Sequence, residues 1–235
     1  MRKIIALCVV SVLAACGEES TPAPTTVTGS VAGSAFVQRD QAAFLGAGNG
    51  CSLSLSPVPV GVSIAVAELT DFTGTCQTAT SCSLKASSTS VTLIIARASP
   101  AGTAPGFKPD RPYQFIDLAT IGTTPPTITP DAELNIPVFT AIVSTVGAAP
   151  TCTPANVIPA TTGSTLTVTG SSSTSISGTV TLVLAGGAGT LTGGFSASTC
   201  AGVPAFDACA ALDGILGGTG GGLPDPCNGS TPTCN

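Results

Sequence analysis

Hydrophobic and polar residues alternate most regularly between Ser164 and Ser198. The inward positions of this pattern are Leu166, Val168, Ile176, Val180, Leu182, Leu184, Leu191, Phe195 and Ala197. Threonines and serines stand between them, and Gly186-Gly187-Ala188-Gly189 interrupts the run as a turn. A period of two with a glycine turn is typical of antiparallel strands that have one face in the core and one in water. The segment therefore predicts a hairpin, and Gly178 and Gly193 inside its strands predict a bulge or close backbone packing.

Shorter stretches repeat the strand pattern. They are Val27–Gln38, Leu53–Leu55, Val62–Ala67, Val91–Ala98, Tyr113–Asp117 and Val138–Val143. Val91–Ala98 is apolar almost throughout, which favours the centre of a sheet. Among windows of ten residues or more, only Phe206–Leu216 has a helical period, and Gly217 and Gly218 would end that helix. About nine strands separated by turns predict an all-β fold, a single antiparallel β-sandwich or flattened β-barrel, over residues 27–205. Residues 206–235 are expected to form a short helix and a Gly-rich tail pinned by disulfides.

The first fifteen residues have the order of a secretory signal. Arg2 and Lys3 precede the uncharged stretch Ile4–Leu13, and small residues follow it. The apolar stretch is about half of the ~20 residues that a membrane-spanning helix needs. We therefore interpret residues 1–15 as a signal peptide.

Leu13-Ala14-Ala15-Cys16 resembles the lipobox of bacterial lipoproteins. The resemblance implies cleavage before Cys16, acylation of Cys16 and a membrane anchor made of several acyl chains. Gly17 is not the aspartate that retains lipoproteins at the inner membrane, so by analogy we expect the outer membrane. Residues 16–26 then comprise the lipidated cysteine and a disordered tether, since they contain acids and prolines but no large apolar residue.

Cysteine is the residue type that says most about the compartment. Of ten cysteines, Cys8 would leave with the signal and Cys16 would carry lipid. The eight that remain are Cys51, Cys76, Cys82, Cys152, Cys200, Cys209, Cys227 and Cys234. An even number in an exported chain predicts disulfides, here four of them, although eight cysteines allow roughly a hundred pairings. Among these, Cys76–Cys82 and Cys227–Cys234 would close short loops, and Cys152–Cys200 would bracket the hairpin.

Few side chains in this sequence are suited to catalysis. The chain has no histidine, which excludes Ser-His-Asp and Cys-His nucleophiles and argues against a zinc site. Paired carboxylates for glycoside chemistry would have to come from the scattered acids Asp40, Glu68, Asp71, Asp110, Asp117, Asp131 and Glu133. Asp131 and Glu133 also lack the spaced oxygen ligands of a calcium loop. We predict no catalytic residue, no metal and no cofactor, and we interpret Tyr113 beside Arg111 as a packed strand end rather than a ligand contact.

The number and distribution of charged residues argue against nucleic acid as a partner. Charged residues make up 8% of the chain, against about 25% in ordinary soluble domains, and the formal net charge is −5. With no basic cluster, the sequence argues against nucleic-acid binding.

The stretch from Ser173 to Cys200 (STSISGTVTLVLAGGAGTLTGGFSASTC) resembles the closing hairpin of uncharacterised lipoproteins of myxobacteria-like bacteria. That resemblance implies no activity. We therefore expect a non-enzymatic envelope module with a structural or binding role, whose partner would be an envelope protein or polysaccharide. Two alternatives stay open, a β-barrel that carries a small apolar ligand and a hydrolase that uses carboxylates alone.

Overall fold

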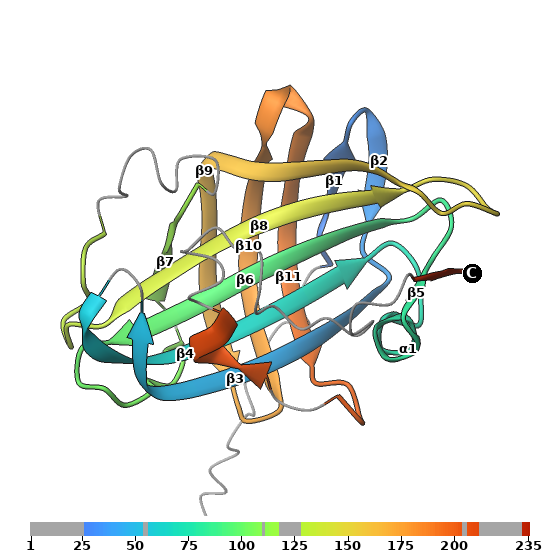
Figure 1. Ribbon diagram of the computed structural model, residues 1–235. Helices are drawn as coiled ribbons and strands as arrows, with labels where there is room; N and C mark the ends of the chain where they lie inside the picture. Colours follow the sequence, from blue (N-terminus) through green and yellow to red (C-terminus); the bar gives the residue numbers. More distant parts are fainter. Residues whose placement is uncertain (1–25, 54–55, 110, 118–127, 204–205, 212–231) are drawn as a thin grey trace, which may run out of the picture.

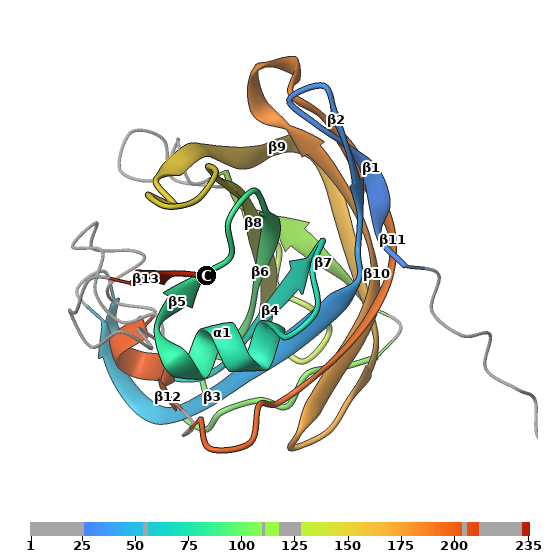
Figure 2. The same ribbon diagram turned by 90° about the vertical axis from the view of Figure 1, so that its right-hand side faces the viewer.

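A computed structural model describes residues 26–53, 56–109, 111–117, 128–203, 206–211 and 232–235 (Figure 1). Within this part of the chain the fold is all-β, as the alternation predicts. The strands are β1 (Thr28–Val31), β2 (Ser34–Val37), β3 (Asp40–Leu53), β4 (Ser56–Thr70), β5 (Ser83–Leu84), β6 (Thr89–Ser99), β7 (Arg111–Phe115), β8 (Ile136–Val146), β9 (Pro154–Ser171), β10 (Ser175–Leu184), β11 (Gly189–Ser198), β12 (Phe206–Asp207) and β13 (Thr233–Cys234). Helix α1 (Thr75–Ser81) follows β4 and lies at the front of the view in Figure 2, and the 3-10 turn η2 (Ala185–Gly187) joins β10 to β11.

The strands form two layers that share β9. The first layer has the order β12-β3-β4-β6-β8, and the second has the order β9-β10-β11-β1-β2. Figure 1 shows strands of the first layer running across the view and those of the second running from top to bottom. The first half of β9 pairs with β8 (Val143 with Ile158), and its second half pairs with β10 (Val180 with Leu166). The bent strand β9 therefore turns one corner of a β-sandwich.

A second corner lies between β2 and β3. The Gln38 amide donates to the Val27 carbonyl in one layer (2.9 Å), and the Arg39 amide donates to the Thr70 carbonyl in the other (2.7 Å). Along this edge β3 is joined to the residue after β11 by a single isolated bridge, between Ala43 and Thr199. The sheet is therefore not closed, and the sandwich rather than the barrel describes the fold.

The main core lies between the two layers. It holds all three of the largest buried aromatic side chains, Phe36, Phe139 and Phe195, each at most 1% exposed. A smaller apolar cluster covers the opposite face of β3, β4 and β6, and it includes Ile64, Ala208 and Ala211. This second cluster explains why β4 and β6 are apolar on both faces.

The predicted hairpin is confirmed as β10 and β11, which pair over their whole length through the turn η2. The central position predicted for Val91–Ala98 is also confirmed, because β6 lies between β4 and β8. The pairing register shifts at Gly178, which is the predicted bulge; a Cβ there would lie 2.5 Å from the Thr167 carbonyl oxygen.

Other expectations need correction. Val27–Gln38 is not one strand but the hairpin β1–β2, which turns at Ala32 and Gly33. The sheet is not wholly antiparallel, because β7 pairs in parallel with β8 and β12 with β3. Parallel partners lie far apart in the sequence, so local alternation carries no signal for them.

Two α-helical segments are seen in the described residues. Helix α1 had no signal in the hydrophobic pattern, and residues 208–211, inside the stretch expected to be helical, are helical. No helix in the described ranges is long and apolar enough to cross a membrane.

Candidate functional site

Disulfides join segments that are distant in the sequence. The pairs resolved in the described residues are Cys51–Cys209, Cys76–Cys200 and Cys152–Cys234. Cys82 is disulfide-bonded as well, whereas Cys227 and Cys16 lie outside the described residues. The prediction that the cysteines form disulfides is therefore confirmed, and each of these three crosslinks spans 82 residues or more.

The sequence left the connectivity open, and the structure excludes the three pairings that it suggested as possibilities. Cys76–Cys82 is excluded because α1 runs between these residues, and six residues of helix advance about 9 Å, beyond the ~7 Å Cα separation that a disulfide tolerates. Cys152–Cys200 and Cys227–Cys234 are excluded because Cys200 bonds Cys76 and Cys234 bonds Cys152. Strand β13 pairs with β5, which carries Cys234 toward Cys152.

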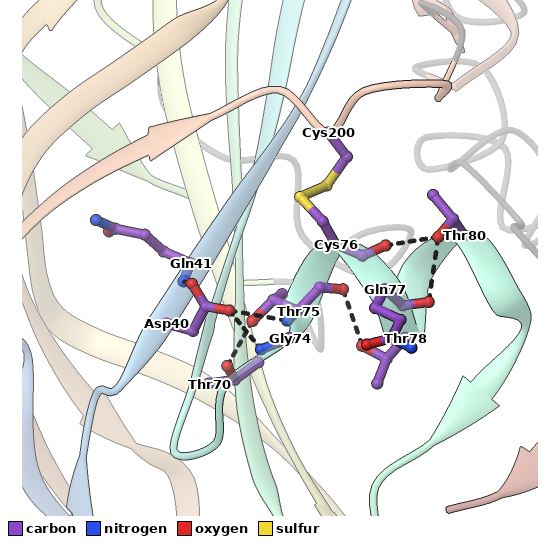
Figure 3. The surroundings of a disulfide bond; sticks show 10 residues. All are labelled: Asp40, Gln41, Thr70, Gly74, Thr75, Cys76, Gln77, Thr78, Thr80 and Cys200. Atoms are coloured by element: carbon purple, nitrogen blue, oxygen red, sulfur yellow. Dashed lines mark hydrogen bonds between the residues drawn. A yellow bond between two sulfur atoms is a disulfide. The ribbon is translucent and has the colours of Figure 1, made fainter.

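Asp40 holds the start of α1 from 35 residues away (Figure 3). Its Oδ2 accepts hydrogen bonds from the amides of Gly74 (2.7 Å) and Thr75 (2.9 Å). Burial acts to raise the pKa of this carboxyl, but the amides of Thr75, Gln41 and Gly74 outweigh it and lower the pKa. Figure 3 also shows the Cys76–Cys200 disulfide on the first turn of α1. Asp40 thus caps the start of α1 from a distant strand.

A charged cluster closes the end of the core opposite α1. Its centre is Arg97 on β6, which is 3% exposed and lies on the inward face two residues after Ile95. The guanidinium donates to the Gly106 carbonyl (2.7 Å), to Asp131 Oδ2 (2.7 Å) and to Glu133 Oε2 (3.0 Å). Lys108 forms an ion pair with the other oxygen of Glu133. The cluster therefore balances two cations against two anions.

Backbone amides fix the acidic side of this cluster. Asp131 Oδ1 accepts from the amides of Glu133 (2.8 Å) and Asn135 (2.9 Å), so the loop folds around that carboxylate. Burial acts to raise the pKa of Asp131, but the Arg97 hydrogen bond and these amides lower it overall. Hydrogen bonds from Lys108 and Arg97 lower the pKa of Glu133. For Arg97, the two carboxylates overcome the effect of burial and raise the pKa of the guanidinium.

Asp131 and Glu133, two of the acids considered for a carboxylate hydrolase, share a partner. Both contact the same Arg97 nitrogen, so the two bonded oxygens lie close enough for glycoside chemistry. However, a general acid needs a raised pKa, and both of these are lowered. The arrangement favours an ion-pair network over an acid and base pair.

The remaining acids on that list are dispersed. Asp71 accepts from the Thr89 amide (3.0 Å), and Asp117 follows β7. Glu68 lies on the outward face of β4 between Ala42 and Thr92, and desolvation raises its pKa. Asp110 lies outside the described residues.

A cavity of about 240 Å³ adjoins the charged cluster. It is lined by Arg97, Lys108, Arg111, Pro112, Tyr113, Gln114, Thr129, Asp131 and Pro137. Tyr113 is 4% exposed, and among the described side chains its hydroxyl is the one buried polar group without a well-formed hydrogen bond. Burial raises the pKa of Tyr113, while the Lys108 backbone and the Arg97 charge act in the opposite direction.

The second layer presents a face of threonines to solvent. Thr165, Thr181, Thr192 and Thr28 are direct neighbours across β9, β10, β11 and β1. We call these four, with Thr167 and Thr179 of the next row, the threonine face. A shallow hollow of about 260 Å³ lies on it, lined by Thr165, Thr167, Thr179, Val180, Thr181, Thr192 and Gly193.

The sequence predicted the threonine face through its alternation but missed the role of Arg97. A signal was present, because Arg97 interrupts the apolar run Val91–Ala98, and a charge on an inward face requires a partner. Its carboxylate partners lie 34 and 36 residues away, so their identity depended on the fold.

Neither a metal-binding arrangement nor similarity to known proteins identifies the function of these sites. In the described ranges no group of three or more Cys, Asp or Glu residues is placed to hold a metal ion. No protein-family model, curated protein or solved structure matches the chain.

Proposed function

We propose that this chain is a lipid-anchored module of the bacterial envelope that binds a neutral, hydroxyl-rich polysaccharide through the threonine face. In this proposal Cys16 carries the acyl chains in the outer membrane, residues 17–26 form the tether, and the β-sandwich is a binding module without catalytic activity.

The lipid anchor is supported by two features of different origin. Leu13-Ala14-Ala15-Cys16 follows a charged start and a short apolar stretch, as in lipoprotein signals. The disulfides of the folded part need an oxidising compartment, which an exported chain reaches.

The threonine face carries the binding part of the proposal. Its two rows repeat at about 4.8 Å between strands and about 6.7 Å along each strand, which gives a flat lattice of hydroxyl and methyl groups. Each hydroxyl both donates and accepts, as sugar hydroxyls do. Because threonine is β-branched, its side chain loses little rotamer freedom on binding.

Charge and composition favour a glycan over other partners for this face. No Asp, Glu, Lys or Arg is among the threonine-face residues or the lining of its hollow. The aromatic and arginine side chains that dominate protein–protein hot spots are also missing from them. A neutral polysaccharide, rich in hydroxyls and free of charge, matches this surface best.

The binding test is co-sedimentation of the full acylated chain, in detergent micelles, with an insoluble neutral glucan. The double variant Thr181→Val and Thr192→Val removes two neighbouring hydroxyls and keeps the side-chain shape. We expect its affinity to fall at least about fivefold, since each lost hydrogen bond is worth roughly 0.5–1.5 kcal/mol. Thr92→Val, on the outward face of β6 in the other layer, is the matched control and should bind as the parent does.

Equal sedimentation of the double variant and the parent would remove the threonine face from the proposal. The anchor is tested separately, by metabolic labelling with an alkyne fatty acid. The parent should be labelled and recovered with outer membranes, and Cys16→Ala should be neither. An unlabelled parent would refute the lipid anchor.

A further inference from the structure

A buried tyrosine hydroxyl beside an ion-pair network points to a second site, apart from the threonine face. Tyr113 belongs to the main core through its ring, and its strand β7 lies at the end where Arg97 closes the sandwich. A buried hydroxyl normally has a hydrogen-bond partner, because leaving one unmade is costly. The Tyr113 hydroxyl makes no well-formed hydrogen bond among the described residues, although the Lys108 backbone interacts with it, and Tyr113 lines a cavity of about 240 Å³.

The charged side chains around this cavity favour a negatively charged ligand. Three cationic side chains, Arg97, Lys108 and Arg111, line it with one anionic side chain, Asp131. Arg97 and Lys108 are engaged by Asp131 and Glu133. Arg111 is exposed and forms no ion pair with a described residue, so its guanidinium stays available at the cavity. Even with Glu133 counted, one positive charge is in excess.

The remaining walls limit what the ligand can be. Gln114 is occupied, because its side-chain oxygen accepts from the Thr129 amide (2.8 Å) and its nitrogen donates to the Thr129 carbonyl. Pro112 and Pro137 give the cavity apolar surface. The volume is just below the ~300 Å³ at which drug-sized pockets begin.

We propose that this cavity binds a small organic carboxylate with a short apolar chain. The carboxylate accepts hydrogen bonds from the Tyr113 hydroxyl and from the fork of Arg111, a geometry that guanidinium groups match well. The apolar chain lies against Pro112 and Pro137. Bound in this way, the ligand supplies the partner that the buried hydroxyl lacks.

The composition provides a selective reporter for this site. Tyr113 is the only tyrosine, and the chain has no tryptophan, so tyrosine fluorescence of the purified full chain comes from the cavity alone. Sodium butyrate is the probe, titrated at constant ionic strength against sodium chloride. Butyramide has the same carbon chain and no charge, and serves as the second probe.

We expect butyrate to change the fluorescence saturably and butyramide to bind at least about tenfold more weakly. Arg111→Gln should weaken butyrate about five- to tenfold, because a charge-assisted bond is lost. Arg39→Gln is the matched control, since Arg39 is an exposed arginine at the other corner, and it should bind as the parent does. Tyr113→Phe, followed by calorimetry and checked for folding by its melting curve, should also lose affinity.

Three results would overturn the proposal. They are no saturable response to butyrate, equal affinity for butyramide, and equal loss in the Arg39→Gln and Arg111→Gln variants. Co-sedimentation with glucan should be unchanged in Arg111→Gln, so failure of this site and failure of the threonine face are distinguishable.

Discussion

Replacing Arg97 with methionine is expected to destabilise the end of the sandwich that holds the charged cluster. Methionine keeps an unbranched apolar stem of similar reach and removes the guanidinium. The Gly106 carbonyl then loses its donor, and Asp131 keeps only the amides of Glu133 and Asn135. The perturbation therefore breaks three hydrogen bonds, two of them to carboxylates.

The magnitude follows from how exposed each partner is. Breaking a fully buried ion pair costs about 3–5 kcal/mol. Arg97 is 3% exposed, but the Asp131 and Glu133 side chains are 13% and 51% exposed, so water replaces part of what they lose. We therefore expect the free energy of unfolding to fall by about 3 kcal/mol, near the lower limit of that range. In a chain of this size, such a loss lowers the melting temperature by roughly 6–12 °C.

The assay is urea and thermal unfolding followed by far-UV circular dichroism at neutral pH. Lys108→Met is the control, because it removes only the exposed contact to Glu133 and should leave the midpoint almost unchanged. The pH dependence gives a second readout. Folding lowers the pKa values of Asp131 and Glu133 from their ordinary values of 3.8 and 4.5. The ion pairs therefore stabilise the fold fully above these ordinary values, and this stabilisation is lost as the pH falls through the lower pKa values of the folded state.

The difference in the free energy of unfolding between the parent and Arg97→Met should therefore become smaller in acid. A loss below about 1 kcal/mol at neutral pH, or a difference independent of pH, would refute the view that this network holds the end of the core.

Further predictions use the same unfolding assay. Asp40→Ala removes the cap of α1 and should cost about 1 kcal/mol, and Asp40→Asn should lose less; equal losses would contradict capping through a side-chain oxygen. Replacing both Cys51 and Cys209 with alanine opens a crosslink whose residues are separated by 158 positions, for which chain entropy gives about 5 kcal/mol at most. The other disulfides already restrict the unfolded chain, so we expect about 2–4 kcal/mol, and no change would refute the crosslink. Tyr113 should ionise above pH 10.0 in an ultraviolet titration of the folded chain, and stability should fall as the pH rises from 10.0 through the folded pKa; ionisation at or below 10.0 would contradict its burial.

The hairpin β10–β11 could be predicted because it is local and has one wet face. Each inward residue from Ile176 to Ala197 is followed by an outward one, so the pattern in the sequence is the pattern of the sheet. Strand β3 could not be predicted in the same way. Its inward Ala43 packs in the main core, and its outward Phe44 packs against the second cluster. A strand that is covered on both faces shows no alternation of apolar and polar residues in the sequence, so the pattern does not reveal which face is inward.

The candidate sites follow the same distinction. The threonine face is a product of local alternation, and it was visible as alternating threonines in β9, β10 and β11. The cavity at Tyr113 is assembled from β6, β7 and the loop before β8, so no single stretch of the sequence contains it. The same holds for Asp40 and α1, because a cap supplied from 35 residues away leaves no capping residue beside the helix.

The positions of the disulfides also show what they stabilise. Each crosslink between described residues ties a small segment to a neighbouring strand, helix or loop at the rim of the sandwich. Cys209 fixes residues 208–211 over the outward face of β3, Cys200 fixes the end of β11 to α1, and Cys234 fixes β13 beside β5. None lies between the two layers, where Phe36, Phe139 and Phe195 already fill the core. The crosslinks therefore act outside the main core, where they hold the covering segments of the first layer in place.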